Sequence, residues 1–218
     1  YKLGVVEFAS VLLIIVSTII VLFNLTKSKE KSNEFQKVLL AHSFTWIGVQ
    51  TMFIYAFFYL TEELGLGDEA GKINSIAFFI LSLVSAVLPV LVLNGFAKKI
   101  GMVKTHLICV FIMALGYAGV LFFGTSVILY YIMIAIAGIG WASVVPLPFA
   151  IMSEKVDQTK MGVYMGIFNL SVVLPQLVAS FKMGEVVNAA SDKSVVFLIC
   201  AVTRAISGVL WLFVKNDK

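Results

Sequence analysis

The sequence predicts an all-α membrane protein whose helices cross the bilayer several times. Of its 218 residues, 61% are hydrophobic and only 13% are charged, and the mean hydropathy is +1.03. A water-facing surface needs more charge than this, so a soluble globular domain is excluded. The apolar residues form runs of about 20, the length that a helix needs to cross the hydrocarbon core. The runs do not alternate between polar and apolar residues as barrel strands do, which favours helices.

Seven such runs, each bounded by charged or polar residues, are predicted to be transmembrane helices. They cover residues 5–25, 42–60, 73–97, 105–124, 127–152, 162–182 and 194–214. Each run is rich in Val, Ile, Leu and Phe, and the Gly and Pro residues inside the runs are tolerated in membrane helices. The longest polar stretch, rich in Lys, Ser and Glu, separates the first run from the other six and is predicted to be a linker at residues 27–41.

The lysines predict how the helices are oriented in the membrane. Eleven of them fall on one side of the predicted helices and four on the other. The positive-inside rule places the lysine-rich side in the cytoplasm, so the N-terminus is predicted outside and the C-terminus inside. The net charge of +4 then reflects topology and contact with lipid headgroups of the bilayer, and no nucleic-acid partner is expected.

Chemistry that needs a metal, a cofactor or a catalytic cluster has no support in the sequence. Cys109 and Cys200 lie in separate apolar runs, and no clustered Cys or His provides the spacing of a metal site. A membrane enzyme should show paired acids, a histidine or a basic phosphate-binding cluster at the end of a helix. No such constellation is evident, so neither an enzyme nor a bound cofactor is predicted.

Two families with seven helices match the topology but not the residues. Microbial rhodopsins hold retinal through a lysine in the last helix, whereas the last run here has Arg204 as its only charge, and a guanidinium cannot form that bond. Small seven-helix sugar exporters repeat a Pro-Gln pair in each three-helix unit, but Pro175-Gln176 occurs once. An exporter-like carrier stays open as an alternative, as does a membrane scaffold or sensor that transports nothing.

Three segments towards the C-terminus carry a more specific resemblance. Residues 138–150 (GIGWASVVPLPFA), 160–170 (KMGVYMGIFNL) and 173–176 (VLPQ) resemble the tenth and eleventh helices of sucrose-type sugar/proton symporters. These symporters belong to the major facilitator superfamily and are akin to the glycoside-pentoside-hexuronide carriers. A weaker resemblance over the whole chain implies helices six to twelve of a twelve-helix carrier.

The resemblance implies a partial major facilitator fold that lacks the first five helices, and the absence of an initiator Met supports a truncated chain. Residues 1–26 would be the last helix of the amino-terminal half, residues 27–41 the cytoplasmic central linker, and residues 42–218 the carboxy-terminal six-helix half. The implied function is secondary active transport of a sugar or glycoside by alternating access. Coupling to a proton or another cation, and a multi-pass location in a plasma membrane such as the bacterial inner membrane, are implied as well.

The turn at residues 94–101 (NGFAKKIG) is similar to a loop of the same superfamily. Between its eighth and ninth helices the superfamily has a Gly-x-x-Ala-Asp-Arg-x-Gly loop, and Lys98 stands here in the place of the acidic residue. The charge relay of that loop is therefore in doubt, while the tight turn and its basic anchoring are kept. The alternative is an ordinary positive-inside loop.

Polar side chains along the sixth run predict one part of a solute site. Asn169, Val173, Gln176 and Ser180 recur at spacings of three and four residues, which places them on one helical face. We predict that Asn169 and Gln176 bind the solute. The alternative is that the two amides form interhelical hydrogen bonds that only hold the bundle together.

Aromatic and amide residues of two other runs predict the rest of the site. Gln50 lies at mid-depth in the second run, on one face with Trp46 and Phe53, while Tyr55 lies on another face. Aromatic rings are a usual platform for the apolar face of a sugar, so Gln50, Tyr55 and Trp141 are predicted to bind substrate. Aromatic residues near the ends of a membrane helix more often form the interfacial belt, which is the alternative.

Two prolines follow Trp141 in the fifth run. Pro146 and Pro148 both lack a backbone donor and must bend or break the helix. Carriers commonly use discontinuous helices where a substrate binds and a hinge moves, so both prolines are predicted to act in gating. A fixed kink is the alternative.

A few residues have predicted structural roles. Arg204 lies inside the last run, where a charge costs about 2.5 to 3.5 kcal/mol, so it is predicted to contact a carbonyl or hydroxyl group. His42 and His106, at the ends of their runs, are predicted to be solvated. Gly162 and Gly166 are predicted to allow close helix packing. The last six runs contain no Asp or Glu in their interior, so a coupling acid is expected in the missing helices.

Overall fold

The computed structural model describes residues 29–216, and all regular elements in this part of the chain are helices joined by short turns. Its elements in order are α2 (Lys29–Phe58), η1 (Tyr59–Glu63), η2 (Gly67–Glu69), α3 (Ala70–Leu88), η3 (Pro89–Leu93), α4 (Asn94–Ile100), α5 (Met102–Phe123), α6 (Val127–Val144), α7 (Pro146–Lys155), η4 (Gln158–Lys160), α8 (Met161–Val178), η5 (Ala179–Met183), α9 (Gly184–Ala189) and α10 (Val195–Trp211). No strand occurs among these residues, and the predicted all-α fold is confirmed.

Six of the seven predicted transmembrane runs coincide with helices. Five continuous helical segments are long and apolar enough to cross a membrane, namely Asn33–Glu63, Gly67–Ile100, Met102–Phe123, Val127–Lys155 and Gln158–Ala189. The shorter apolar helix α10 accounts for the last predicted run. The run at 5–25 lies outside the described residues. Because α2 begins at Lys29, most of the stretch predicted as a linker at 27–41 is helical.

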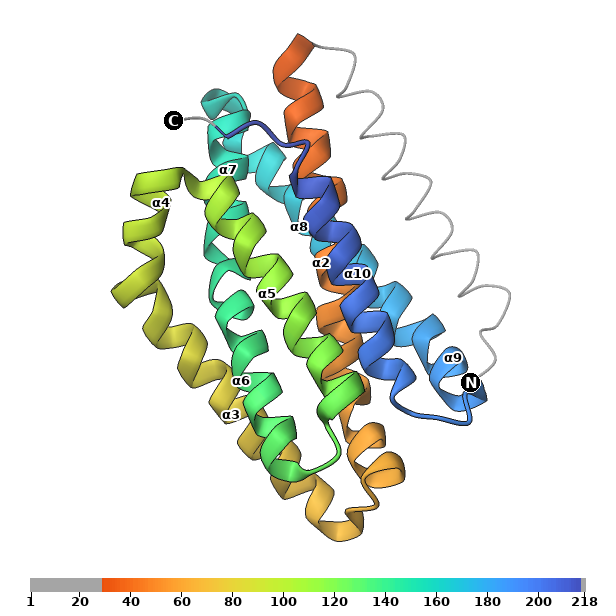
Figure 1. Cartoon of the computed structure of the whole chain (residues 1–218). Helices are drawn as coiled ribbons and strands as arrows, with labels where there is room; N and C mark the ends of the chain where they lie inside the picture. Colours follow the sequence, from red (N-terminus) through yellow and green to blue (C-terminus); the bar gives the residue numbers. More distant parts are fainter. Residues whose placement is uncertain (1–28, 217–218) are drawn as a thin grey trace, which may run out of the picture.

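The helices form a bundle in which the main contacts follow one order from helix to helix. α3 packs on α6, α6 on α5, α5 on α10, α10 on α2, and α2 on α8. Figure 1 shows α3 and α4 along one side of the bundle and α10, α2 and α8 towards the other, with α5 and α6 between them. The flanking helices α3 and α8 therefore have the largest exposed apolar faces.

Two glycines set the close contact between α5 and α6. A Cβ atom at Gly116 would lie 2.7 Å from the backbone nitrogen of Ala137 and 2.9 Å from the carbonyl oxygen of Met133, while one at Gly140 would lie 2.5 Å from the carbonyl oxygen of Cys109. Small residues let helix backbones approach in this way, and the resulting van der Waals contact stabilises helix pairs in a membrane.

The glycines predicted to serve this purpose do not do so. A Cβ atom at Gly162 or Gly166 would meet nothing within 4 Å, so this prediction is wrong for the described part of the chain. Both glycines are exposed on α8, away from its packing face. A small-xxx-small spacing alone does not say which face of a helix is buried, and here the spacing falls on the outward face.

The turn between α4 and α5 depends on one glycine. Gly101 has φ 89°, a left-handed conformation that favours glycine. A Cβ atom there would also collide with the side chain of Asn216, which donates a hydrogen bond to the carbonyl oxygen of Ile100 at 3.0 Å. The chain therefore turns sharply after Ile100 and starts α5 at Met102, as the predicted tight turn requires.

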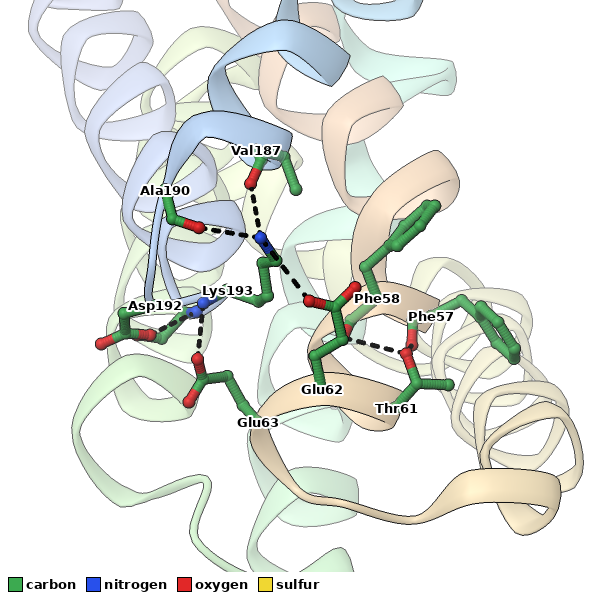
Figure 2. A network of polar contacts seen from close by, with 10 residues as sticks. Phe57, Phe58, Thr61, Glu62, Glu63, Val187, Ala190, Asp192 and Lys193 are labelled. Atoms are coloured by element: carbon green, nitrogen blue, oxygen red, sulfur yellow. Dashed lines mark hydrogen bonds and ion pairs between the residues drawn. The ribbon is translucent and has the colours of Figure 1, made fainter.

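Hydrogen bonds to carboxylates connect α2 to the two ends of α10. Beyond the end of α2, Glu63 accepts a hydrogen bond from the backbone N–H of Lys193 at 2.6 Å (Figure 2). The Lys193 ammonium donates to the carbonyl oxygens of Val187 and Ala190 and lies 3.5 Å from a Glu62 oxygen. Near the start of α2, Glu34 accepts from the backbone N–H of Lys215 at 2.7 Å.

Asp192 shapes the turn that leads into α10. Its carboxylate accepts hydrogen bonds from the hydroxyl group and, at 2.7 Å, from the backbone N–H of Ser194 (Figure 2). These bonds, the one from the hydroxyl group first, hold the pKa of the Asp192 carboxyl group below its usual value. Asp192 is exposed, so this effect fixes the local turn and carries little of the overall stability.

Candidate functional site

Four aromatic side chains from three helices form a cluster on the partly exposed side of the bundle. We call Trp46, Phe53, Phe78 and Trp141 the aromatic cluster. Trp141 of α6 contacts two rings of α2, with centroid distances of 6.0 Å to Trp46 and 5.5 Å to Phe53. Phe53 in turn contacts Phe78 of α3 at 5.0 Å. All three contacts are edge-on, the geometry that aromatic pairs prefer. Each ring stays partly exposed, so the cluster leaves some apolar surface uncovered within the described part of the chain.

Gln50 lies within this stretch of α2. It follows Trp46 by four residues and precedes Phe53 by three, so the three side chains share one helical face. The Gln50 side chain is partly exposed and makes no hydrogen bond to any residue that the structure describes. An amide with free donors and an acceptor beside apolar rings has the composition of a binding site for a polar neutral solute.

Tyr55 occupies a different position from Gln50. It is buried, and its hydroxyl group lies 3.2 Å from the carbonyl oxygens of both Ala179 and Ser180, to which it donates. These carbonyl groups belong to η5, the π-helical turn that follows α8. The contact joins α2 to the end of α8 and engages the hydroxyl group that was predicted to bind substrate.

Asn169 and Gln176 lie on a flank of α8 away from its packing face. The buried positions of this helix are Ile167, Phe168, Ser171 and Pro175. Asn169 is exposed, Gln176 is partly exposed, and neither side chain makes a hydrogen bond within the described residues. The structure thus brings Trp141 next to the Gln50 stretch of α2, whereas no hydrogen bond among the described residues links either amide of α8 to that stretch.

The helix that carries Trp141 is interrupted at the two prolines. α6 ends at Val144 and α7 begins at Pro146, so the break falls at Val145, where the prolines predict it. Pro146 is exposed and Pro148 is buried. The break lies four residues after Trp141, close enough for a change in the bend to move this ring relative to α2.

A buried polar layer lies behind the aromatic cluster. We define it as His42, His106, Tyr117 and Arg204, whose exposed fractions are 2% for His42 and 0% for the other three. The indole N–H of Trp46 donates to Nε2 of His42 at 2.8 Å, and the His42 ring stacks on Phe168 with a centroid distance of 4.8 Å. His42 therefore connects the aromatic cluster to α8.

The prediction that both histidines are solvated is wrong for the described residues. Both histidines are buried, not solvated. Arg204 was expected to contact a carbonyl or hydroxyl group, and the hydroxyl group of Tyr117 lies beside its guanidinium, although no nitrogen atom of Arg204 makes a hydrogen bond of good geometry among the described residues. Tyr117 and both histidines are near enough to interact electrostatically with its charge.

Side-chain spacing could have placed one of these histidines in the interior. His42 precedes Trp46 by four residues and lies on one face with Thr45 and Val49, both of which are buried. His42 was predicted to be solvated because it lies at the start of the apolar run. The apolar run does not show that α2 extends further towards residue 29, so that His42 lies inside the helix.

The sequence matches the Major Facilitator Superfamily over residues 5–180. The chain belongs to this superfamily of membrane carriers, which are not enzymes. The structure is similar to that of the POT family transporter PepTSo, with a TM-score of 0.69 and 18% identity over 85% of this chain and 37% of that one. It is also similar to an auto-inhibited POT family peptide transporter, with a TM-score of 0.64 and 17% identity over 85% of this chain and 38% of that one.

These comparisons establish the fold and the family but not the solute. The chain spans less than two fifths of the length of either structural neighbour. No curated protein matches the sequence. Within the described residues, no group of three or more His, Cys, Asp or Glu side chains could hold a metal ion.

Proposed function

We propose that the chain is the carboxy-terminal part, helices six to twelve, of a secondary transporter for a sugar or glycoside that works by alternating access. The observation that carries this proposal is the aromatic cluster beside the unpaired amide of Gln50. Aromatic rings offer flat apolar surface for one face of a pyranose, and an amide both donates to and accepts from hydroxyl groups. No charged residue belongs to this stretch of α2 or to the aromatic cluster.

The roles of the individual residues follow from their positions. Trp141 would stack on the sugar ring, and Gln50 would bind its hydroxyl groups. Asn169 and Gln176 would complete the site where the missing amino-terminal helices cover the outward flank of α8, because an amide facing lipid would be costly. Tyr55 would support the site by fixing η5 against α2. Pro146 and Pro148 would form the hinge of a gate.

Coupling and location belong to the same proposal. A proton or another cation would drive uptake, with its acidic residue in the missing amino-terminal helices, since no Asp or Glu lies at mid-span in the described helices. The lysine-rich end of the bundle, which bears Lys98, Lys99, Lys104 and Lys215, would face the cytoplasm of a bacterial-type plasma membrane.

A peptide is the second candidate substrate, because both structural neighbours belong to the POT family and one is named as a peptide transporter. A free peptide carries a charged amino group and a charged carboxylate, and both need charged or strongly polar partners when they leave water. The aromatic cluster and Gln50 provide neither. The described half of the site therefore fits a neutral polyhydroxylated solute better.

The test is uptake by the natural full-length protein in proteoliposomes, with radiolabelled sucrose and dialanine offered separately under a proton gradient. Sucrose should accumulate, and Gln50→Ala and Trp141→Ala should each reduce kcat/KM about tenfold or more, the cost of one lost solute contact of about 1.4 kcal/mol. The matched controls are Asn188→Ala and Phe122→Ala, which change an amide and an aromatic ring exposed elsewhere. Both should leave uptake unchanged.

Each contrary result removes a stated part of the proposal. Accumulation of dialanine without sucrose would replace the sugar by a peptide. Normal sucrose uptake by Gln50→Ala and Trp141→Ala would remove the aromatic cluster from the site. Uptake of neither solute, nor of a panel of glycosides, by well-folded protein would support the scaffold or sensor alternative.

A further inference from the structure

A cavity at the lysine-rich end of the bundle is separate from the aromatic cluster. Its volume is about 900 Å³, within the range of small-molecule sites. It lies around the turn between α4 and α5, and the end of α7 and the segment after α10 also contribute to it. Its polar and charged lining residues are Lys98, Lys99, Lys104, Glu154 and Asn216.

The lysines of this cavity are not neutralised by the protein. None of Lys98, Lys99 and Lys104 makes an ion pair with a carboxylate in the part of the chain that the structure describes. Glu154 is the single carboxylate among the lining residues, so three positive charges face one negative charge. Such an excess attracts an anion.

The position of Lys104 adds to this argument. Lys98 and Lys99 lie in the last turn of α4, where the helix dipole favours cations. Lys104 lies in the first turn of α5, where the same dipole disfavours a cation, and that turn contains no acidic residue. Lys104 therefore does not stabilise the helix at this position. It would, however, stabilise an anion held in the cavity.

The cavity also has an apolar wall that points to a lipid. Leu107 and Ile108 line it three and four residues after Lys104, so they lie on the same face of α5, one turn further towards the middle of the helix. Ile108 is 46% exposed. Ammonium groups at the end of a membrane helix with exposed apolar side chains one turn deeper match the headgroup and the first acyl carbons of a phospholipid.

We propose that this cavity binds an anionic phospholipid, with its phosphate held by Lys98, Lys99 and Lys104 and its acyl chains lying along Leu107 and Ile108. Basic pockets between membrane helices hold anionic headgroups in this way. The inference needs only a membrane-spanning chain and does not depend on the transported solute.

The test is native mass spectrometry of the natural full-length protein in detergent, titrated with phosphatidylglycerol, phosphatidylethanolamine or phosphatidylcholine. Phosphatidylglycerol should bind at least about tenfold more tightly than the other two lipids. The triple variant Lys98→Gln, Lys99→Gln, Lys104→Gln should lose about tenfold to a hundredfold in this affinity. The corresponding triple arginine variant should retain it.

A matched control separates the cavity from overall charge. The variant Lys72→Gln, Lys160→Gln, Lys182→Gln also loses three positive charges, but at exposed positions outside the cavity, and it should bind phosphatidylglycerol normally. Glu154→Gln should raise the affinity about fivefold, because it removes the single negative charge of the lining. A solely structural role of these residues predicts no gain of binding.

Three outcomes would overturn the proposal. Equal binding of the three lipids would show that the headgroup charge is not recognised. Equal losses in the two glutamine triple variants would assign the effect to net charge. Displacement of the lipid by inorganic phosphate at a similar concentration would show a site for a soluble anion. The lipid-binding measurement and the sucrose or dialanine uptake assay give independent results, so failure of one proposal does not imply failure of the other.

Discussion

At the scale of single residues, the most unusual feature is the burial of Arg204. A cation inside a membrane helix costs about 2.5 to 3.5 kcal/mol on insertion scales even with some relief from its surroundings. Trp46 donates to Nε2 of His42, so a neutral His42 carries its proton on Nδ1 and offers another donor. Nε2 of His106 is also without a hydrogen-bond partner in the described structure, and the hydroxyl group of Tyr117 lies beside the guanidinium. The Arg204 guanidinium has five N–H donors and no acceptor, so this buried polar layer has more hydrogen-bond donors than acceptors.

This surplus leads to a prediction for stability. Arg204→Met keeps most of the side-chain volume and removes the buried charge, so it should raise the free energy of unfolding by about 1 to 4 kcal/mol. The measurement is unfolding by sodium dodecyl sulfate in mixed micelles, followed by tryptophan fluorescence. Arg204→Lys is the control, and it should give no such gain because the charge stays buried. A loss of stability in Arg204→Met would mean that the native protein pairs this guanidinium with water, an ion or residues outside those described.

The sequence predicts the environment of a residue well only where the hydropathy or the side-chain spacing of a single helix determines it. The hydropathy places α2 to α10 in the membrane, and the spacing of Gln50 between Trp46 and Phe53 places the three on one face. The burial of His106 is different, because it depends on which side of α5 meets α6 and α10. α5 is apolar all round, so its sequence gives no preferred face and the partners cannot be foreseen.

At the scale of elements, π-helical turns interrupt the long helices. η1 follows α2, η3 continues α3 from Pro89, and η5 follows α8. Such turns shift the register of a helix and often occur at functional sites. Pro89 explains η3, since it removes one helical hydrogen bond. Only the proline-linked irregularities, here and at Pro146, could be predicted from the sequence, because no proline marks the other two turns.

The contact between α5 and α6 gives a prediction about helix packing. Gly116→Ala places a methyl group against backbone atoms of Ala137 and Met133, which cannot move without shifting α6. It should destabilise the protein by about 1 to 3 kcal/mol, as overpacking does. Gly162→Ala is the matched control, since its methyl group meets no atom within 4 Å. It should be neutral or stabilise by up to about 1 kcal/mol through helix propensity.

Thermal unfolding in detergent, followed by circular dichroism at 222 nm, compares the two alanine variants directly. A lower melting temperature for Gly116→Ala alone would establish the α5–α6 contact. Equal melting temperatures would contradict the close approach of these two helices. The comparison also tests the reading of Gly162, which lies in an apolar helix as Gly116 does but faces no neighbouring atom within 4 Å.

At the scale of the whole molecule, α2 and α10 are fastened to each other at both ends. Glu34 holds the backbone of Lys215, and Glu63 holds the backbone of Lys193. Ser207 of α10 also donates to the carbonyl oxygen of Ala41 at 2.8 Å between these points. The pair α2 and α10 is therefore held in a fixed arrangement. A conformational change within this half has to occur at a segment with fewer stabilising contacts. The break between α6 and α7 is such a place, since α6 carries Trp141 and α7 begins anew at Pro146.

This reasoning predicts that the prolines affect movement more than folding. In the natural full-length transporter, the double variant Pro146→Ala, Pro148→Ala restores the missing backbone donors and allows one continuous helix from α6 into α7. Its melting temperature should stay the same or rise. Its maximal rate of solute uptake in proteoliposomes should fall about tenfold, because hinge changes slow the conformational step. Pro175→Ala is the control, since Pro175 lies inside α8, which continues past it without a break. This variant should leave the rate of uptake unchanged. A double variant that transports at the normal rate would show that the break is a fixed kink and that the gate lies elsewhere.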